Sequence, residues 1–176
     1  MIQIRDAAGF KLERQVEYGT PEQNEAVRRI IDDVRREGDA AVFRYTEKFD
    51  GVAAERLKGR LRVDEAELAA AYDKVDAAFV EALRKAAANI RDFHERQKRQ
   101  SWVHLRPDGT MVGMNIRPLK RVGVYVPGGS AAYPSSVLMN VIPAKVAGVP
   151  EIVMVTPPAT GGKEGIAPEI LVAAAE

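Results

Sequence analysis

A glycine-rich turn follows a strongly apolar stretch in the second half of the chain. Residues 122–126 are almost all apolar, and Pro127-Gly128-Gly129-Ser130 comes directly after them. Glycines let a backbone approach a ligand closely. A helix that begins soon afterwards presents free N–H groups and partial positive charge, which suit a pyrophosphate. The segment therefore indicates a candidate site for a phosphate-bearing cofactor at the end of a strand.

The pattern alone leaves a second interpretation open. The spacing is not GxGxxG, and Ser130 precedes the expected helix cap, Ser135 or Ser136, by five or six residues. A plain strand-to-helix turn, whose glycines only satisfy backbone angles, explains it equally well. Tyr125, just before the turn, can flank a nucleotide with its ring, although core packing is the commoner role of a single strand tyrosine.

A second apolar run reaches the same expected edge. Residues 152–155 end at Thr156-Pro157-Pro158-Ala159-Thr160-Gly161-Gly162, and a helix is expected between the two runs, from about Ser135 to Ala147. Strand, helix and strand in this order indicate two parallel strands with a right-handed crossover. Because neither run alternates, we expect both to be buried on both faces. Ligands bind at the carboxyl edge of such sheets.

The sequence offers few residues for a metal site or for nucleophilic catalysis. The chain has no cysteine, and its two histidines, His94 and His104, lie ten residues apart on different expected elements. A zinc site needs three or four ligands, so structural roles are expected for both. There is no hydrolase elbow, Walker loop or HExxH motif. The residues alone show no complete active site.

Composition narrows the partners and the compartment. The 176 residues include 26 basic and 25 acidic side chains, a formal charge of +1, so no strong field favours nucleic acid or an anionic membrane. No segment resembles a signal peptide or approaches eighteen uninterrupted apolar residues. We expect a cytoplasmic protein that binds neither nucleic acid nor membrane, and the lack of cysteine suits a reducing compartment.

The first two thirds of the chain read as helices followed by a hairpin. Thr20-Pro21-Glu22-Gln23 is a capping-box start for a helix that Gly38 ends. The further expected elements are a helix after Asp39, a short strand over 61–63, a helix opened by Asp64 and Glu67, a long helix over 76–100, and a hairpin around Pro107-Asp108-Gly109 with strands over 102–106 and 110–117.

The predicted fold class is α/β. Residues 1–118 form a helical region with a β-hairpin, which leads into an incomplete Rossmann-like parallel sheet over 119–176. A last helix, expected over 167–176, has no C-cap and no strand after it. Two parallel strands do not make a stable sheet alone, so we expect further strands from other polypeptide or from a partner.

The quoted motifs resemble a known family. VGVYVPGGSAAYPSSVLMNVIPAKVAGVPEIVMVTPP, with the upstream stretches 38–41, 45–50 and 90–94, is similar to the N-terminal part of histidinol dehydrogenases, from about Val27 onward. The resemblance implies NAD-dependent oxidation of L-histidinol to L-histidine through L-histidinal, in histidine biosynthesis. It further implies a zinc-containing homodimer, built on two incomplete Rossmann-like domains, whose active sites take residues from both subunits.

The resemblance also assigns residues. It implies that Tyr125 contacts NAD and that Pro127, Gly128 and Gly129 line the cofactor cleft. In family terms, 1–118 contains the opening portion of the first Rossmann-like domain, and 119–176 is the first half of the second. The family's zinc ligands and acid/base pair lie beyond the equivalent of Glu176, so this stretch alone is expected to be inactive. The alternative is a non-catalytic fragment or nucleotide-binding module.

Overall fold

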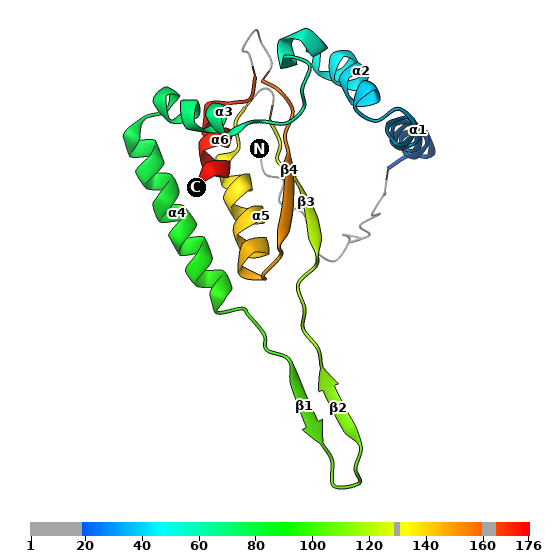
Figure 1. Cartoon of the computed structure of the whole chain (residues 1–176), viewed down its shortest axis with the longest axis vertical. Coiled ribbons are helices and arrows are strands. Elements are labelled where there is room, and N and C mark those ends of the chain that lie inside the picture. Colours follow the sequence, from blue (N-terminus) through cyan, green and yellow to red (C-terminus); the bar gives the residue numbers. More distant parts are fainter. Residues whose placement is uncertain (1–18, 129–130, 160–164) are drawn as a thin grey trace, which may run out of the picture. The chain divides into compact units, whose positions relative to one another are not determined.

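The computed structural model describes residues 19–128, 131–159 and 165–176 (Figure 1). The chain divides into two units, Met1–Val42 and Phe43–Glu176, and each is described by itself. Gly129 and Ser130 of the glycine-rich turn, and Thr160 to Gly162 of the second loop, lie outside the described residues.

The first unit contains helix α1 (Pro21–Glu37), which begins as predicted. The Thr20 hydroxyl accepts a hydrogen bond from the Gln23 N–H at 3.3 Å, and the Gln23 side chain accepts one from the Thr20 N–H at 2.9 Å. Gly38, at φ 61°, ends the helix. Helix α2 (Asp39–Asp50) begins directly afterwards and crosses the boundary between the units.

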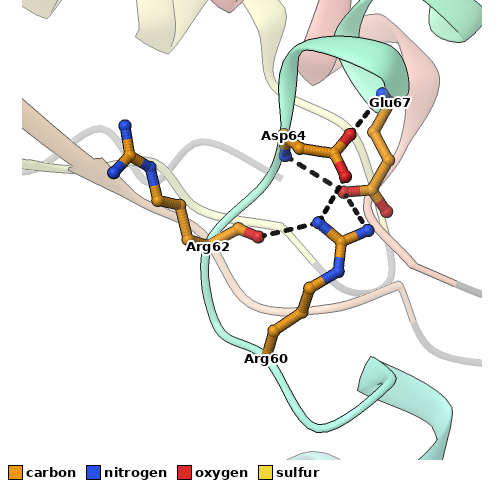
Figure 2. A network of polar contacts seen from close by, with 4 residues as sticks. All are labelled: Arg60, Arg62, Asp64 and Glu67. Atoms are coloured by element: carbon orange, nitrogen blue, oxygen red, sulfur yellow. Dashed lines mark hydrogen bonds and ion pairs between the residues drawn. The ribbon is translucent and has the colours of Figure 1, made fainter.

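A polar network lies between the 3-10 turn η2 (Ala54–Leu57) and the next helix of the second unit (Figure 2). Asp64 and Glu67 form a capping box for helix α3 (Glu65–Ala71). The Arg60 guanidinium bonds to Asp64 Oδ2 at 2.7 Å, and its other nitrogen lies 3.0 Å from Glu67 Oε2. Arg60 also donates to the Arg62 carbonyl at 3.3 Å.

The prediction of a strand over 61–63 is wrong. The structure has irregular backbone there, and no described strand pairs with it. A side chain, rather than a neighbouring strand, satisfies the Arg62 carbonyl. The segment is therefore the approach to the capping box of α3.

Helix α4 (Ala77–Glu95) follows the turn η3 (Tyr72–Lys74) and is capped by Asp76, which accepts from the Ala78 N–H at 2.9 Å. Val80 and Leu83 are buried, whereas Phe93 is exposed. The helix ends at Glu95, earlier than the predicted residue 100, where a turn follows in which the Gln97 N–H donates to the His94 carbonyl at 3.0 Å.

The predicted hairpin is confirmed, with shorter strands. Strand β1 (Trp102–Leu105) pairs antiparallel with β2 (Met111–Met114). In the turn, Gly109 takes φ 85°, and the Asp108 carboxylate accepts from the Thr110 N–H at 2.9 Å.

The parallel strand–helix–strand unit is also confirmed. Strand β3 (Arg121–Tyr125), helix α5 (Pro134–Val146), strand β4 (Glu151–Val155) and helix α6 (Pro168–Ala175) follow in order, and β3 pairs parallel with β4. Helix α5 packs against α4 and α6, and α6 also packs against α3. The shared core consists of Ala71, Val80, Leu83, Val124, Val126, Val137, Leu138, Ile142, Val146, Ile170, Val172 and Ala173.

The expectation that both faces of the sheet are buried is wrong for the described residues. Val124 and Val126 point into the core, whereas Tyr125, Val153 and Val155 lie on the opposite face and are exposed. Successive strand residues point to opposite faces. The face with Val124 and Val126 packs in the core with residues of α5 and α6, whereas the apolar residues of the other face are exposed.

Candidate functional site

The two parallel strands end side by side, which forms the edge predicted from the sequence. Tyr125 and Val155 are the last paired residues. The ladder continues by one bond, in which the Val126 N–H donates to the Val155 carbonyl at 2.9 Å. Pro127 and Gly128 therefore leave the sheet next to Thr156 and Pro157. The structure thus brings the first, described residues of the two candidate loops together at the carboxyl edge, where ligands of parallel sheets bind.

Gly128 is required by its neighbours at this edge. A Cβ atom at position 128 would lie 2.9 Å from Thr156 Oγ1 and 3.3 Å from Pro157 Cγ. Cβ atoms essentially never approach another heavy atom so closely, so a side chain here would push the two loops apart. The absence of a side chain lets the backbone of Gly128 lie against the second loop.

Thr156 is a residue of this edge that the sequence did not single out for a role. Its hydroxyl oxygen is buried and has no hydrogen-bond partner among the described residues. Buried polar atoms are nearly always paired. The sequence did carry one signal for this role, because Thr156 is a hydroxyl residue directly after an apolar strand. The structure places it across the edge from the glycine turn.

Tyr125 lies on the open face of the sheet, opposite Val155. Its side chain is 66% exposed, so it does not pack in the core of the described chain. Pro127 is exposed and Gly128 half-buried beside it. An aromatic ring with an accessible face next to a glycine turn can stack on a flat heteroaromatic group. The remaining predicted site residue, Gly129, lies outside the described residues.

The start of helix α5 differs from the prediction. The helix begins at Pro134, and Tyr133 is its N-cap residue, so Ser135 and Ser136 lie in the first turn instead of capping it. Tyr133 makes no side-chain capping bond, and its carbonyl accepts from the Ser136 N–H at 3.0 Å. Proline at the first helical position favours this start, because its fixed φ matches a helix and it lacks an N–H. The first-turn N–H groups therefore have no side-chain cap.

Neither histidine joins the edge. Nδ1 of His94 lies 2.7 Å from the Gln97 side-chain oxygen at the end of α4, and His104 lies in β1. Within the described ranges, no three histidine, cysteine, aspartate or glutamate side chains are grouped so that they could hold a metal ion. In the same ranges, no helix is both long and apolar enough to cross a membrane.

A second polar cluster joins α6 to the helical region. The Arg84 Nε donates to Glu176 Oε1 at 2.9 Å, and the Tyr72 hydroxyl donates to the same oxygen at 3.1 Å. The Arg84 guanidinium holds the pKa of the Glu176 carboxyl below its usual value. Burial, with the neighbouring Glu176 carboxylate, raises the pKa of Tyr72. The cluster connects η3, α4 and α6, and its position on these helices gives it a structural role.

The parallel strands, the crossover helix and the glycine turn at their carboxyl edge define an α/β protein. Residues 13–176 match the family model described as histidinol dehydrogenase. The chain is 53% identical over 171 residues to a histidinol dehydrogenase of Geobacillus kaustophilus, which covers 97% of this chain and 39% of that protein. It is 50% identical over 174 residues to that of Bacillus subtilis, with 98% and 39% covered.

The fold agrees with this similarity. A crystal structure of histidinol dehydrogenase from Elizabethkingia anophelis matches with a TM-score of 0.79 at 35% identity, covering 92% of this chain and 36% of that one. The chain belongs to the histidinol dehydrogenase family and corresponds to its N-terminal region. It spans about two fifths of the length of the curated relatives that it matches.

Proposed function

We propose that this chain supplies one wall of the NAD site of an enzyme that oxidises L-histidinol to L-histidine through L-histidinal. The observation that supports it most directly is the edge itself: Gly128 is packed against Thr156 with no room for a side chain, in a chain whose residues 13–176 match the family. The hydroxyl of Thr156, which has no hydrogen-bond partner among the described residues, supports a polar ligand at this edge.

The residues of the edge have separate roles in this proposal. Tyr125 stacks against the dinucleotide on the open face of the sheet, and Pro127, Gly128 and Gly129 line the cleft. The first-turn N–H groups of α5 point toward the phosphates, which their partial positive charge attracts. When bound, NAD accepts the hydride that leaves the carbinol carbon of the substrate.

The rest of the reaction belongs to polypeptide that this chain does not include. The described residues include no group of three or more histidine, cysteine, aspartate or glutamate side chains that could hold a zinc ion. We propose that zinc, the acid/base residues and most histidinol contacts come from the remaining three fifths of the family's length, in a cytoplasmic homodimer. Residues 1–118 and 119–176 are then parts of its two Rossmann-like domains.

A chimera tests this function. The chain is joined to the remaining part of the Geobacillus kaustophilus relative, and NADH formation from histidinol is followed by absorbance with added zinc. The chain alone is expected to give no sustained turnover, whereas the chimera is expected to be active. Turnover by the chain alone would contradict the proposed division of the active site.

The rival proposal is a nucleotide-binding module without chemistry, which would use the same glycine turn at the carboxyl edge of the sheet. Both proposals predict that NAD binds at the edge. Only the rival predicts that the chimera fails to oxidise histidinol although it is correctly folded. Folding is checked by comparing its circular dichroism spectrum with that of the Geobacillus kaustophilus relative.

A further inference from the structure

The hydroxyl of Thr156 is an unusual group in this chain. Among the side chains of the described residues, its Oγ1 is the only buried nitrogen or oxygen without a hydrogen-bond partner. Buried polar atoms are nearly always paired, and an unpaired one costs free energy. Valine has nearly the same shape as threonine and carries no polar atom, so packing gives no reason for a hydroxyl at this position. The hydroxyl therefore requires a partner that the described chain does not supply.

The backbone on both sides of Thr156 is held by hydrogen bonds. The Val126 N–H donates to the Val155 carbonyl at 2.9 Å, which extends the ladder to the residue before Thr156. Three residues after Thr156, the Ala159 N–H donates to the Gly165 carbonyl at 2.8 Å, and Ala159 is buried. The fold therefore brings the unpaired hydroxyl to a defined position, and a loosely held backbone does not explain it.

This position is next to the start of the glycine turn. A Cβ atom at Gly128 would lie 2.9 Å from Thr156 Oγ1, and the next two nearest atoms are ring carbons of Pro157. Of the three atoms closest to that position, only the threonine oxygen is polar. The hydroxyl is therefore the polar group that the second loop presents to the turn at Gly128.

A phosphate is the ligand group that suits this hydroxyl. Phosphate oxygens accept hydrogen bonds, a threonine O–H donates one, and hydrogen bonds to charged oxygens are stronger than those between neutral groups. The glycine turn leads to helix α5, whose first turn has no side-chain cap and whose N–H groups attract the same kind of anion. Both ends of the turn therefore favour a phosphate at this edge.

A small local movement brings the hydroxyl to such a ligand. In the ligand-free chain Oγ1 is covered, whereas Thr156 as a whole is only half-buried, so part of the residue already lies at the surface of the described chain. Rotation about the Cα–Cβ bond moves the hydroxyl between staggered positions and leaves the backbone in place. The hydroxyl can therefore leave its covered position without disruption of the sheet edge.

We propose that Thr156 is a cofactor-binding residue, whose hydroxyl donates a hydrogen bond to a phosphate oxygen of the dinucleotide. This inference rests on the proposed function, because it places the hydrogen bond in the NAD site. It adds a residue of the second loop to a wall otherwise made by Tyr125 and the glycine turn. The hydroxyl lowers the stability of the ligand-free chain and contributes affinity in the complex.

Calorimetric titration of the 176-residue chain with NAD and with ADP tests the hydrogen bond. Thr156→Val removes the hydroxyl and keeps the shape of the side chain. It should raise both dissociation constants at least about tenfold, as loss of a hydrogen bond to a charged group does. Thr156→Ser keeps the hydroxyl and should bind like the parent. Adenosine has no phosphate and should bind the parent and Thr156→Val equally, so an equal loss of adenosine affinity would overturn the proposal.

Thermal denaturation without ligand separates this role from a structural one. Thr156→Val should be at least as stable as the parent, because the hydroxyl that it removes has no described partner. Ser101→Ala is the matched control, since the Ser101 hydroxyl accepts from the Ile116 N–H at 2.8 Å. Its loss should lower the stability and leave the NAD affinity unchanged. A less stable Thr156→Val would show that its hydroxyl is already paired in the free chain, which overturns the proposal.

The titrations also separate this inference from the proposed function. If the parent binds NAD and Thr156→Val binds it equally well, Thr156 does not contact the cofactor, although the cofactor wall stands. If the parent binds neither NAD nor ADP, both the wall and the role of Thr156 are overturned. Loss of affinity in Thr156→Val, with Thr156→Ser like the parent, supports the hydrogen bond.

Discussion

Gly128 and Thr156 lie against each other across the carboxyl edge of the parallel sheet, although they are far apart in the sequence. A Cβ atom at Gly128 would approach Thr156 Oγ1 to 2.9 Å. The two loops that leave β3 and β4 thus pack against each other. A substitution at Gly128 or at Thr156 is therefore expected to change the stability of this edge.

Replacing Gly128 by alanine should therefore destabilise the sheet edge by about 1–3 kcal/mol, the usual cost of overpacking. Urea denaturation measures the effect, and Gly123→Ala is the matched control. Gly123 lies in the same strand, and its added Cβ would meet nothing within 4 Å. If both variants lose equal stability, the contact with Thr156 does not constrain position 128.

Removing the Thr156 hydroxyl should raise the stability of the protein, whereas the Gly128→Ala substitution lowers it. Thr156→Val keeps the shape of the side chain and removes a buried oxygen that has no described partner, so stability is expected to rise by about 1 kcal/mol. Thermal and urea denaturation measure the change. A loss of more than about 1 kcal/mol would indicate that the hydroxyl is hydrogen-bonded in solution.

Tyr125→Ala should weaken NAD binding by about 1 kcal/mol, a factor of roughly five, while histidinol binding changes less. The reason is the exposed ring next to the glycine turn. Calorimetric titration of the active chimera measures both ligands, and Tyr125→Phe, which keeps the ring, is the control. Equal NAD affinity in Tyr125→Ala and the parent would reject the assignment.

The Glu176 cluster predicts a pH dependence. Hydrogen bonding to Arg84 lowers the pKa of the Glu176 carboxyl below its ordinary value of 4.5. A carboxyl with a lowered pKa in the folded state contributes stability above its unfolded-state pKa and loses it as the pH falls through the lowered value. Glu176→Gln should therefore be less thermally stable than the parent at pH 7, and the difference should shrink below about pH 4.5. A difference that persists in acid would mean that the carboxylate charge contributes nothing.

Much of the fold could be predicted because its signals are local. The capping boxes of Thr20 with Gln23 and of Asp64 with Glu67 each involve residues three positions apart, and both form as expected. The turn at Asp108 and Gly109 likewise defined the hairpin. The apolar runs of β3 and β4, with a helix between them, predicted the parallel pairing.

The errors arise where distant residues decide the structure. Residues 61–63 have strand-forming composition, but Arg60 reaches forward to the capping box, and none of the described strands pairs with them. Helix α4 was expected to reach residue 100, but a turn closed by the Gln97 N–H and the His94 carbonyl follows it directly after Glu95. The contact between Gly128 and Thr156 was equally beyond the sequence, because it depends on how two strands align.

The most direct test of the proposed cofactor wall is an NMR titration of the 15N-labelled chain with NAD. We predict that the amide signals of Tyr125, Gly128 and the first turn of α5 shift with increasing NAD, while those of the hairpin turn at Gly109 do not move. Shifts confined to other parts of the chain, or no shift at millimolar NAD, would contradict the account.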